Sequence, residues 1–349
     1  MGDSSVPQIS ERKSDHLRIN LDRDVTAKGI DNGFDSYRFV HRALPEIDLR
    51  EVDTSLELFG KRLSAPILIS CMTGGTPEAR KINRSLAYVA EERGIAIGVG
   101  SGRALLEHPE LLDSFDVRPV APNALLFANL GAVQLNKGYG TAECRRLVDA
   151  LRADALVLHL NPLQEALQPE GDTVFRGLGA RIAQVCRELE VPVIVKEVGW
   201  GITAHEVRSL FDGGAAAVDV AGAGGTSWSE VERHRLGQTW RANVAATFAG
   251  WGIPTAEALC DARRLSPEGL IFASGGVRNG LDAAKAMALG ANLVGVAAPF
   301  LRAAAQSTGD AMATALQFAE EIRIVMFLIG ARTLDELRGT KDLTRLVNI

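Results

Sequence analysis

The residues from His159 to Glu165 place several groups that can do chemistry directly after a short apolar run at 155–158. An apolar run followed by a polar turn that contains proline is typical of a buried strand delivering side chains into a site. His159, Asn161 and Gln164 offer hydrogen bonds, and Glu165 adds a carboxylate that can hold a hard cation such as Mg²⁺. Taken alone, the same residues also fit a solvated Asn-Pro turn, so the surrounding elements decide between the two interpretations.

The composition favours an α/β enzyme. The chain has 349 residues, of which 46% are hydrophobic, 5% are aromatic and 35 are glycine. This length suits either two domains or one large α/β barrel with extensions, and the many small residues suit helices packed on parallel strands. The formal net charge of −5 and the lack of a long basic block argue against binding to nucleic acids or anionic membranes.

The cysteines and the apolar segments bear on the cellular compartment. Cys71, Cys144, Cys186 and Cys260 form no CxxC pair, which argues against a zinc site or a disulfide framework and favours a reducing cytoplasm. The first residues lack the basic and then apolar pattern of a secretion signal, and the most apolar late segment carries charges. We therefore expect a soluble, cytoplasmic protein.

From residue 65 onward one pattern recurs, which is a short apolar run, a turn rich in Gly or Asn, and then a helical stretch. The predicted strands end near Ser70, Gly98, Asn129, His159, Glu197, Val220, Ser274 and Val296. The predicted helices cover residues 77–93, 103–113, 141–152, 176–189, 203–212, 239–249 and 281–289, with one or more after Pro299. Eight such units fit a (β/α)8 or TIM barrel better than an open doubly wound sheet.

Two segments precede the predicted barrel. Residues 1–36 are polar and weakly periodic, which predicts an N-terminal arm. Residues 37–64 mix charged and apolar residues in a way that predicts short edge strands. The barrel with C-terminal helices would then span residues 65–349. In such a barrel the carboxyl ends of the strands meet at one face, where the catalytic loops gather.

Turns after the late strands predict a phosphate site. Residues 274–280 follow the predicted seventh strand and residues 296–299 follow the eighth, where barrels commonly bind phosphate. Glycine lets the backbone approach an anion closely, although both segments also fit ordinary turns. Lys196 ends an apolar run and would point into the barrel mouth. It could stabilise charge on a ring, act as a base, or form a structural ion pair with a neighbouring carboxylate.

Together these features resemble an FMN-binding barrel, and the individual motifs resemble type 2 isopentenyl diphosphate isomerases more closely. The motifs that carry the resemblance are Arg12-Lys13-x-x-His16, Met72-Thr-Gly-Gly75, Gly100-Ser-x-Arg103, His159-Leu-Asn-Pro-Leu-Gln-Glu165, Lys196-Glu-Val-Gly199, Asp219-Val-Ala-Gly-x-Gly-Gly-Thr-Ser-Trp228 and Ser274-Gly-Gly-x-Arg278. The family commonly has Gln where this chain has Gly102, so any contact made by that side chain is missing here.

The resemblance implies interconversion of isopentenyl and dimethylallyl diphosphate by an allylic proton shift in isoprenoid biosynthesis, with Mg²⁺ and with FMN reduced by NADPH or another reductant. It implies FMN contacts by Met72, Thr73, Gly74, Ser101, Asn129, Lys196, Thr226, Gly275, Gly276, Val277, Arg278, Ala297 and Ala298. It implies substrate contacts by Arg12, Lys13, Ser101, Arg103, His159, Asn161 and Gln164, with Glu165 as the magnesium ligand. His159, Gln164 and Lys196 would be catalytic, Gln164 relaying a proton and Lys196 tuning the flavin. The family also tends to form homotetramers or octamers.

Three other functions are weighed against this one. A 2-hydroxy-acid oxidase or related FMN-dependent barrel oxidoreductase would need a base, typically a histidine after a late strand, whereas the last histidine is His234. A flavin-binding protein without catalysis would need neither the pair at 164–165 nor the pair at 12–13. A nucleotide dehydrogenase barrel would need a catalytic cysteine in a late loop, and Cys260 has no such motif.

Overall fold

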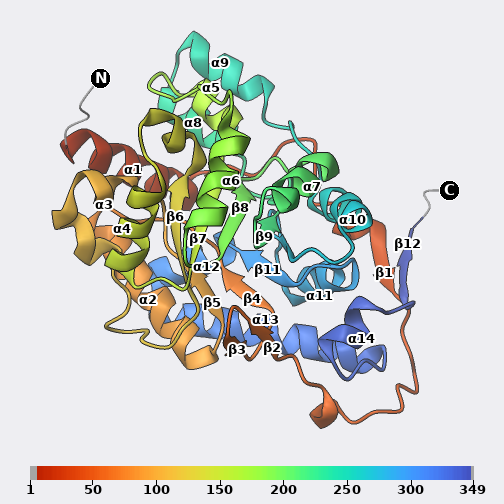
Figure 1. Cartoon of the computed structure of the whole chain (residues 1–349). Helices are drawn as coiled ribbons and strands as arrows, with labels where there is room; N and C mark the ends of the chain where they lie inside the picture. Colours follow the sequence, from red (N-terminus) through yellow and green to blue (C-terminus); the bar gives the residue numbers. More distant parts are fainter. Residues whose placement is uncertain (1–5, 347–349) are drawn as a thin grey trace.

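A closed barrel of eight parallel strands forms the centre of the protein (Figure 1). The computed structural model describes the backbone of residues 6–346 and the side chains of residues 11–346, so the ends of the predicted arm and barrel segments, 1–5 and 347–349, lie outside the described residues. Around the barrel the strands follow the order β10-β11-β4-β5-β6-β7-β8-β9. Their bounds are β4 Ile67–Ile69, β5 Ala96–Gly98, β6 Leu126–Gly131, β7 Ala155–Leu160, β8 Val193–Glu197, β9 Ala217–Asp219, β10 Ile271–Ala273 and β11 Leu293–Val296. The predicted barrel is confirmed.

Helices cover the outside of the barrel. They include α2 Pro77–Arg93, α3 Arg103–Glu107, α4 Thr141–Leu151, α6 Leu178–Glu188, α7 Ala204–Asp212, α11 Gly280–Ala288, α12 Ala298–Gln306, α13 Thr308–Leu328 and α14 Leu334–Arg338. The sequence pattern predicts one helix over 103–113, but α3 ends at Glu107 and a 3-10 helix, Pro109–Ser114, follows it. Pro109 explains the break, because the residue before a proline disfavours helical dihedral angles.

The segment between β9 and β10 differs most from the prediction. It contains three helices, α8 Trp228–Leu236, α9 Trp240–Thr247 and α10 Thr255–Leu265, whereas the sequence pattern predicts one helix at 239–249. That predicted helix corresponds to α9, which packs on α8. The helix that packs beside α7 and β10 in the outer layer of the barrel is α10. Helices α8 and α9 therefore belong to an enlarged loop that follows the carboxyl end of β9.

A helix, α1 Val6–Asp22, forms much of the segment predicted as an arm. It packs on α8 and also contacts α12. Leu17 and Ile19 anchor it, with exposed fractions of only 4% and 8%. Most of the stability of such a helix comes from tertiary packing, so the weak apolar periodicity of this segment does not reveal it.

A hairpin fills the amino end of the barrel. It consists of β2 Leu56–Leu58 and β3 Lys61–Leu63, which pair antiparallel. Leu58 and Leu63 pack with side chains from the interior of the barrel, and Phe59 meets the edge of Phe127 with ring centroids 6.1 Å apart. Another short strand, β1 Tyr37–Phe39, pairs with β12 Leu343–Arg345 near the C-terminal end. Because the amino end is filled, a ligand must enter the barrel from the carboxyl end.

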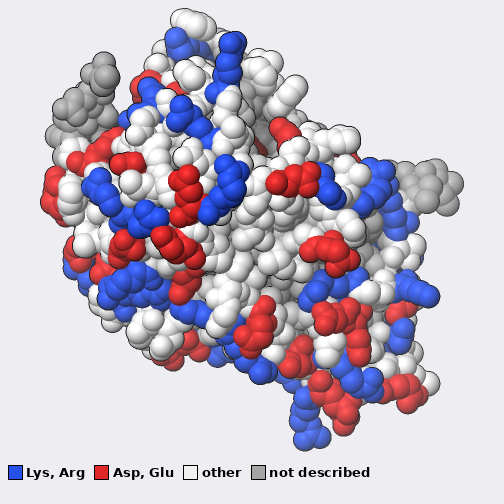
Figure 2. Space-filling model, in the orientation of Figure 1, with Lys and Arg blue, Asp and Glu red and all other residues white. Residues whose placement is uncertain are grey.

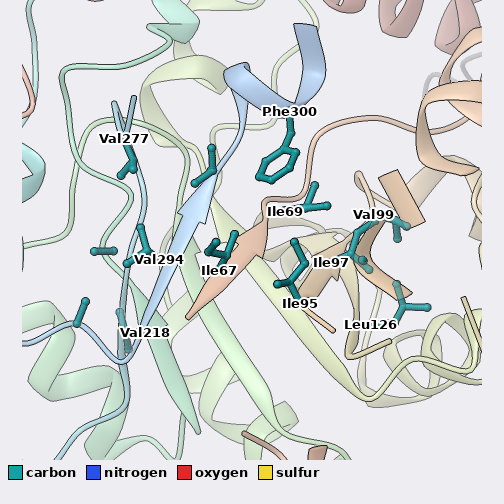
Figure 3. Close-up of a cluster of buried hydrophobic side chains, with 14 of the residues drawn as sticks. Ile67, Ile69, Ile95, Ile97, Val99, Leu126, Val218, Val277, Val294 and Phe300 are labelled. Atoms are coloured by element: carbon teal, nitrogen blue, oxygen red, sulfur yellow. The ribbon is translucent and has the colours of Figure 1, made fainter. Parts of the chain in front are cut away.

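The main core lies between the barrel and its helices. Figure 3 shows Ile67 and Ile69 of β4 beside Ile97 of β5, with Phe300 of α12 close to Ile69. Leu68, between the two isoleucines, instead joins the cluster inside the barrel. This alternation follows the two-residue period of a strand and fixes which side chains face inward. The short strands are thereby held in register at the point where they deliver the polar residues that follow them.

Between residues 6 and 346, no helix is both long enough and apolar enough to cross a lipid bilayer. Figure 2 shows basic and acidic side chains interspersed over the face in view rather than gathered in one basic area. This face therefore offers no concentrated positive charge to a polyanion.

Candidate active site at the carboxyl end of the barrel

A cavity of about 600 Å³ opens at the carboxyl end of the barrel. Ligand sites usually enclose roughly 300–1,000 Å³. Its walls come from α1 and from the segments that follow the barrel strands. All of the site residues predicted from the sequence lie on these walls, namely Arg12, Lys13, Met72, Thr73, Gly74, Ser101, Arg103, Asn129, His159, Asn161, Gln164, Glu165, Lys196, Thr226, Gly275, Gly276, Val277, Arg278, Ala297 and Ala298. The structure brings these residues together, while the role of each one stays a prediction.

Three neighbouring strands place a histidine, an amide and a lysine next to one another. His159 of β7 is in register with Lys196 of β8, and its Nδ1 lies 2.7 Å from Oδ1 of Asn129 on β6. Since a carbonyl oxygen only accepts hydrogen bonds, Nδ1 carries the proton and Nε2 is left for a ligand. Burial, and next the charge of Lys196, lower the pKa of His159 to about 3. His159 is therefore a neutral hydrogen-bonding group at physiological pH.

Lys196 does not form the structural ion pair that the sequence leaves open. Its Nζ donates to the carbonyl oxygen of Glu197 at 2.6 Å, and no carboxylate within ion-pair distance is found for it among residues 11–346. The carboxylate of Glu197 instead accepts the backbone N–H groups of Val198, Gly199 and Trp200 at 2.6–2.7 Å. Burial nevertheless raises the pKa of Glu197 to about 7. The ammonium group of Lys196 is thus available to the cavity.

The short helix α5, Pro162–Leu167, presents the polar residues after His159 to the cavity. Residues three and four positions apart share a helix face, so Asn161, Gln164 and Glu165 lie together. The Nδ2 of Asn161 donates to Oε1 of Gln164 at 3.1 Å and to Oε1 of Glu165 at 2.8 Å. Asn161 and Gln164 are only 4% and 8% exposed, which rules out the solvated turn. The Oδ1 of Asn161 is buried without a partner among the described residues, which leaves an acceptor for a ligand.

The loop after α5 holds the carboxylate of Glu165 from its other side. The backbone N–H of Asp172 donates to Oε2 of Glu165 at 2.6 Å. The side chain of Asp172 pairs with Arg103 at 3.3 Å and with Lys137 at 2.6 Å. Arg103 also donates to Glu107 at 2.8 Å. Asp172 and Glu107, which the sequence analysis does not identify, therefore partly neutralise a predicted diphosphate-binding arginine.

Gly171 allows this loop to approach α5. A Cβ at this position would lie 1.8 Å from the carbonyl oxygen of Glu165, so Gly171→Ala must displace the loop. We expect the free energy of unfolding to fall by about 2 kcal/mol, because overpacking commonly costs that much. Chemical denaturation would measure it.

The matched control is Gly179→Ala in α6, where an added Cβ meets nothing within 4 Å. That change is expected to raise the free energy of unfolding by a few tenths of a kcal/mol to about 1 kcal/mol, because alanine favours the helix. Equal effects of the two substitutions would contradict the close packing of the loop.

Glu232 of α8, which is buried behind the cavity wall, is the principal contact of the site that the sequence analysis misses. It accepts hydrogen bonds from Gln164 at 3.4 Å, from Gln168 at 2.6 Å and from His16 at 3.0 Å. Burial opposes ionisation, but the hydrogen bond from His16 and the charge of Arg235 lower the pKa of Glu232 to about 2. Glu232 is thus an ionised acceptor behind Gln164. In the sequence, the only pattern around Glu232 is its position three residues before Arg235. An acidic residue spaced in this way from a basic one is typical of a solvated helix face, so the pattern does not indicate a site.

Helix α1 crosses the mouth of the cavity and is fixed there by specific contacts. The Nζ of Lys13 donates to the carbonyl oxygen of Ser101 at 3.1 Å and lies 4.8 Å from the ring centroid of Phe115. His16 meets Trp228 edge to face at 5.2 Å, and both residues line the cavity. Arg12 lines it as well. The predicted arm therefore contributes two cationic residues directly to the site.

The walls suit a flavin phosphate at one end. Gly275 and Gly276 follow β10 with φ values of 101° and 70°, which favour glycine. Helix α12 begins at Ala298, and no side chain among the described residues caps its N-terminus. Such a terminus directs free N–H groups toward an anion. Backbone and glycine surfaces from the segments after β4, β9 and β10 line the rest of this region, which gives a flat ring system close access.

The residues around Glu165 fit a Mg²⁺ ion that is shared with a substrate. No group of three or more His, Cys, Asp or Glu side chains that could hold a metal occurs in the described part of the chain. Mg²⁺ is usually held by one or two carboxylates together with substrate phosphates and water. A single carboxylate beside Arg103 and the N-terminal cations matches that pattern rather than an all-protein metal cage.

The comparisons with known proteins agree with this arrangement. A family model described as FMN-dependent dehydrogenase matches residues 7–106 and 178–344. An isopentenyl-diphosphate delta-isomerase of Nostoc sp. (strain PCC 7120) is 49% identical over 343 residues, which cover 98% of each chain. The corresponding proteins of Synechocystis sp. (strain PCC 6803) and Oceanobacillus iheyensis are 53% and 46% identical, covering 93% and 95% of this chain and the same shares of their own.

Solved structures give the fold alone. A mandelate oxidase variant superposes with a TM-score of 0.66 at 18% identity, covering 99% of this chain and 100% of its own.

The segment that the dehydrogenase model leaves out, 107–177, contains the His159–Glu165 stretch, whereas the isomerase relatives match nearly the whole chain. The isomerase relatives therefore match this chain across the segment that contains this part of the site, which the dehydrogenase model leaves out. The chain belongs to the FMN-dependent, type 2 isopentenyl-diphosphate delta-isomerase family.

Proposed function

We propose that the protein interconverts isopentenyl and dimethylallyl diphosphate by an allylic proton shift, with Mg²⁺ and reduced FMN, in isoprenoid biosynthesis. The observation that carries the proposal is the cluster of buried Asn161 and Gln164 with half-buried Glu165, which lies beside the cations of the mouth. A flavin binder without catalysis would not need this cluster. The family membership supports the same conclusion.

The substrate diphosphate would bind at the mouth of the cavity. Arg12, Lys13 and Arg103 line this region and can meet phosphate oxygens, the arginines through two parallel hydrogen bonds. Glu165 would hold Mg²⁺ against the same diphosphate. Asp172 and Glu107 restrain Arg103 before the substrate arrives, so binding requires an exchange of partners. This arrangement fixes the charged end of the substrate and leaves its alkene facing the flavin region.

The proton shift requires groups that position a proton without water. The amide of Gln164 lies between Asn161 and the ionised Glu232, so it can orient a proton relay on one side of the substrate. Neutral His159, which carries its proton on Nδ1, can accept a hydrogen bond at Nε2 but is too weakly basic to remove a carbon-bound proton. Reduced FMN, when bound, would supply an electron-rich ring that stabilises positive charge developing on the alkene. Lys196 would stabilise negative charge on that ring.

The rival function, a 2-hydroxy-acid oxidase, is less well supported. The fold likeness to mandelate oxidase does not extend to a histidine placed after a late strand, which such an oxidase would typically use as its base. Of the two histidines that line the cavity among the described residues, His159 has its pKa lowered to about 3, and His16 comes from the N-terminal helix α1 rather than from a loop after a late strand. The isomerase relatives, at about half identity over nearly the full chain, favour the isomerase over this alternative.

The remaining expectations are proposals of the same kind. We propose a cytoplasmic enzyme that uses NADPH as the reductant of FMN and assembles as a homotetramer or octamer, and that binds neither nucleic acid nor membrane. The even mixture of charges on the face in Figure 2 supports the absence of a polyanionic partner.

An anaerobic conversion assay tests the proposed function. The purified protein would be supplied with isopentenyl diphosphate, FMN, NADPH and Mg²⁺, with and without a chelator. We expect dimethylallyl diphosphate only when both reduced flavin and metal are present. Bound flavin without any product would refute the isomerase activity while leaving the cofactor assignment intact.

The affinity of the site for a diphosphate is expected to fall as the pH rises through about 7. Burial, and next the charge of Arg12, lower the pKa of Lys13 to about 7, so its ammonium group is charged below this pH and neutral above it. Loss of one cation should raise the Kd of inorganic diphosphate by about tenfold between pH 6 and 8.5. Titration calorimetry on the FMN-loaded protein would measure this dependence.

Lys13→Arg is the control, because a guanidinium stays charged over this range. Any pH dependence left in this variant reports the ionisation of the ligand itself. The same pH dependence in both proteins would show that Lys13 does not titrate in contact with the diphosphate.

A further inference from the structure

The part of the cavity suited to the FMN phosphate contains two arginines with very different surroundings. Arg278 follows the glycines after β10, and Arg302 lies in α12, whose N-terminus forms the other wall. Sequence patterns single out only Arg278. The structure allows the two guanidinium groups to be compared directly.

The guanidinium of Arg278 is already occupied by two carboxylates. Its Nε and Nη2 donate to Asp282 at 2.8 and 3.1 Å, and its Nη2 and Nη1 donate to Asp35 at 2.8 and 3.1 Å. Asp282 is only 2% exposed, so removing its partner would leave a buried charge. The three groups together carry a net negative charge. An approaching phosphate would have to displace a carboxylate to reach this arginine.

The same contacts brace the loop that carries the glycines. Asn32 Nδ2 donates to the carbonyl oxygen of Gly276 at 2.6 Å, and Lys285 Nζ donates to the carbonyl oxygen of Phe34 at 3.0 Å. Asp35, in the same segment, holds Arg278. The segment 32–35 is therefore clamped to the turn between β10 and α11. Arg278 serves this clamp.

Arg302 differs in each of these respects. It lies four positions after Ala298, so the two residues share one face of α12, and both line the cavity. Side chains of a helix lean toward its N-terminus, so Arg302 leans toward the uncapped N–H groups at Ala298. No ion pair or hydrogen bond of its guanidinium is found among the residues whose side chains are described. Arg302 is exposed and remains available to a ligand.

We propose that Arg302, rather than Arg278, makes the guanidinium contact to the 5′-phosphate of FMN, while Arg278 braces the glycine turn through Asp35 and Asp282. The proposal rests on FMN occupying the cavity, which the family supports, and not on the isomerase reaction. Arginine binds phosphate through paired hydrogen bonds, and the N-terminus of α12 would supply the remaining donors.

The test compares FMN with riboflavin, which lacks the phosphate. Apoprotein would be titrated with each flavin, and binding would be followed by quenching of flavin fluorescence. Arg302→Gln is expected to raise the Kd of FMN by about tenfold, because an exposed charged hydrogen bond has that order of effect, and to leave the Kd of riboflavin unchanged. Arg187→Gln, an exposed arginine of α6, is the matched control and is expected to change neither value.

Arg278→Gln separates the two roles. Because this substitution loosens the turn rather than removing a phosphate contact, it is expected to raise the Kd values of FMN and riboflavin by similar factors. It is also expected to lower the melting temperature of the protein. The preference for FMN is the Kd of riboflavin divided by the Kd of FMN. The proposal is overturned if Arg302→Gln leaves this preference unchanged, or if Arg278→Gln is the only one of the two substitutions that reduces it. It is also overturned if Arg302→Gln weakens only inorganic diphosphate, which would place Arg302 in the substrate site. Failure of the isomerase assay would affect none of these outcomes.

Discussion

Replacing Glu165 with glutamine is expected to lower kcat/KM for isopentenyl diphosphate by about a thousandfold, equivalent to about 4 kcal/mol, while FMN stays bound. Glu165 is the carboxylate that lies beside the cations of the cavity mouth and is assigned to Mg²⁺. An amide keeps the size of the side chain but removes the charge that a hard cation needs. Steady-state kinetics across a Mg²⁺ titration, together with flavin absorbance to measure FMN occupancy, would check the result.

The surroundings of Glu165 make this substitution interpretable. Its two oxygens accept hydrogen bonds from Asn161 at 2.8 Å and from the N–H of Asp172 at 2.6 Å. The new amide NH₂ would face one of these donors, but the amide of Asn161 can turn its unpaired Oδ1 toward it. Local structure can therefore adapt, and the loss of activity reports the charge. Glu257→Gln on the exposed side of α10 is the control. Unchanged Mg²⁺ dependence in Glu165→Gln, or loss of FMN from it, would remove the metal assignment.

The barrel could be predicted from the sequence because its signal is local and repeated. Each strand is a short apolar run followed by a turn, and the observed strand ends lie within two residues of the predicted ones, as at Gly131 for β6 and Asp219 for β9. Once the barrel is established, the polar residues after different strands must converge on one face. This is why His159, Lys196 and Gly275 could be grouped without any contact information.

Elements stabilised by distant contacts could not be predicted in the same way. Helix α1 is held by Leu17 and Ile19 in the core and by His16 on Glu232, which lies 216 positions later in the chain. Within the segment itself these residues give no clear helical period. Helices α8 and α9 form an insertion after β9, and their place in the fold follows from packing rather than from local pattern.

Residues that act by positioning another side chain could not be predicted from the sequence either. Asp172 holds Glu165 by its backbone N–H, which every residue except proline possesses, so its identity carries no signal. Glu232 reaches Gln164 only because α8 folds over α5. In both cases the sequence identifies the group that faces the ligand, and the structure adds the group that positions it.

Replacing Gln164 with leucine is expected to lower kcat by about a thousandfold with little change in FMN affinity, because a positioned proton-transfer group contributes roughly 10²–10⁴ in rate. Leucine has a similar size but can neither donate to Glu232 nor accept from Asn161. The readout is incorporation of deuterium from D₂O into both diphosphates, followed by mass spectrometry. Gln184→Leu, at an exposed amide of α6 bonded to Glu188, should behave like the unsubstituted protein.

The variant Gln164→Glu distinguishes proton relay from simple packing. A carboxylate at this position would lie near Oε1 of Glu232, which is 3.4 Å from the present amide nitrogen. Two carboxylates that close cannot both ionise easily, so the pair would hold one proton at low pH. At low pH, where the pair holds the shared proton, Gln164→Glu should therefore be more active than Gln164→Leu. As the pH rises and the shared proton is lost, this advantage should disappear. If Gln164 serves only to fill space, leucine will support turnover as well as glutamate does, and neither variant will show this pH dependence.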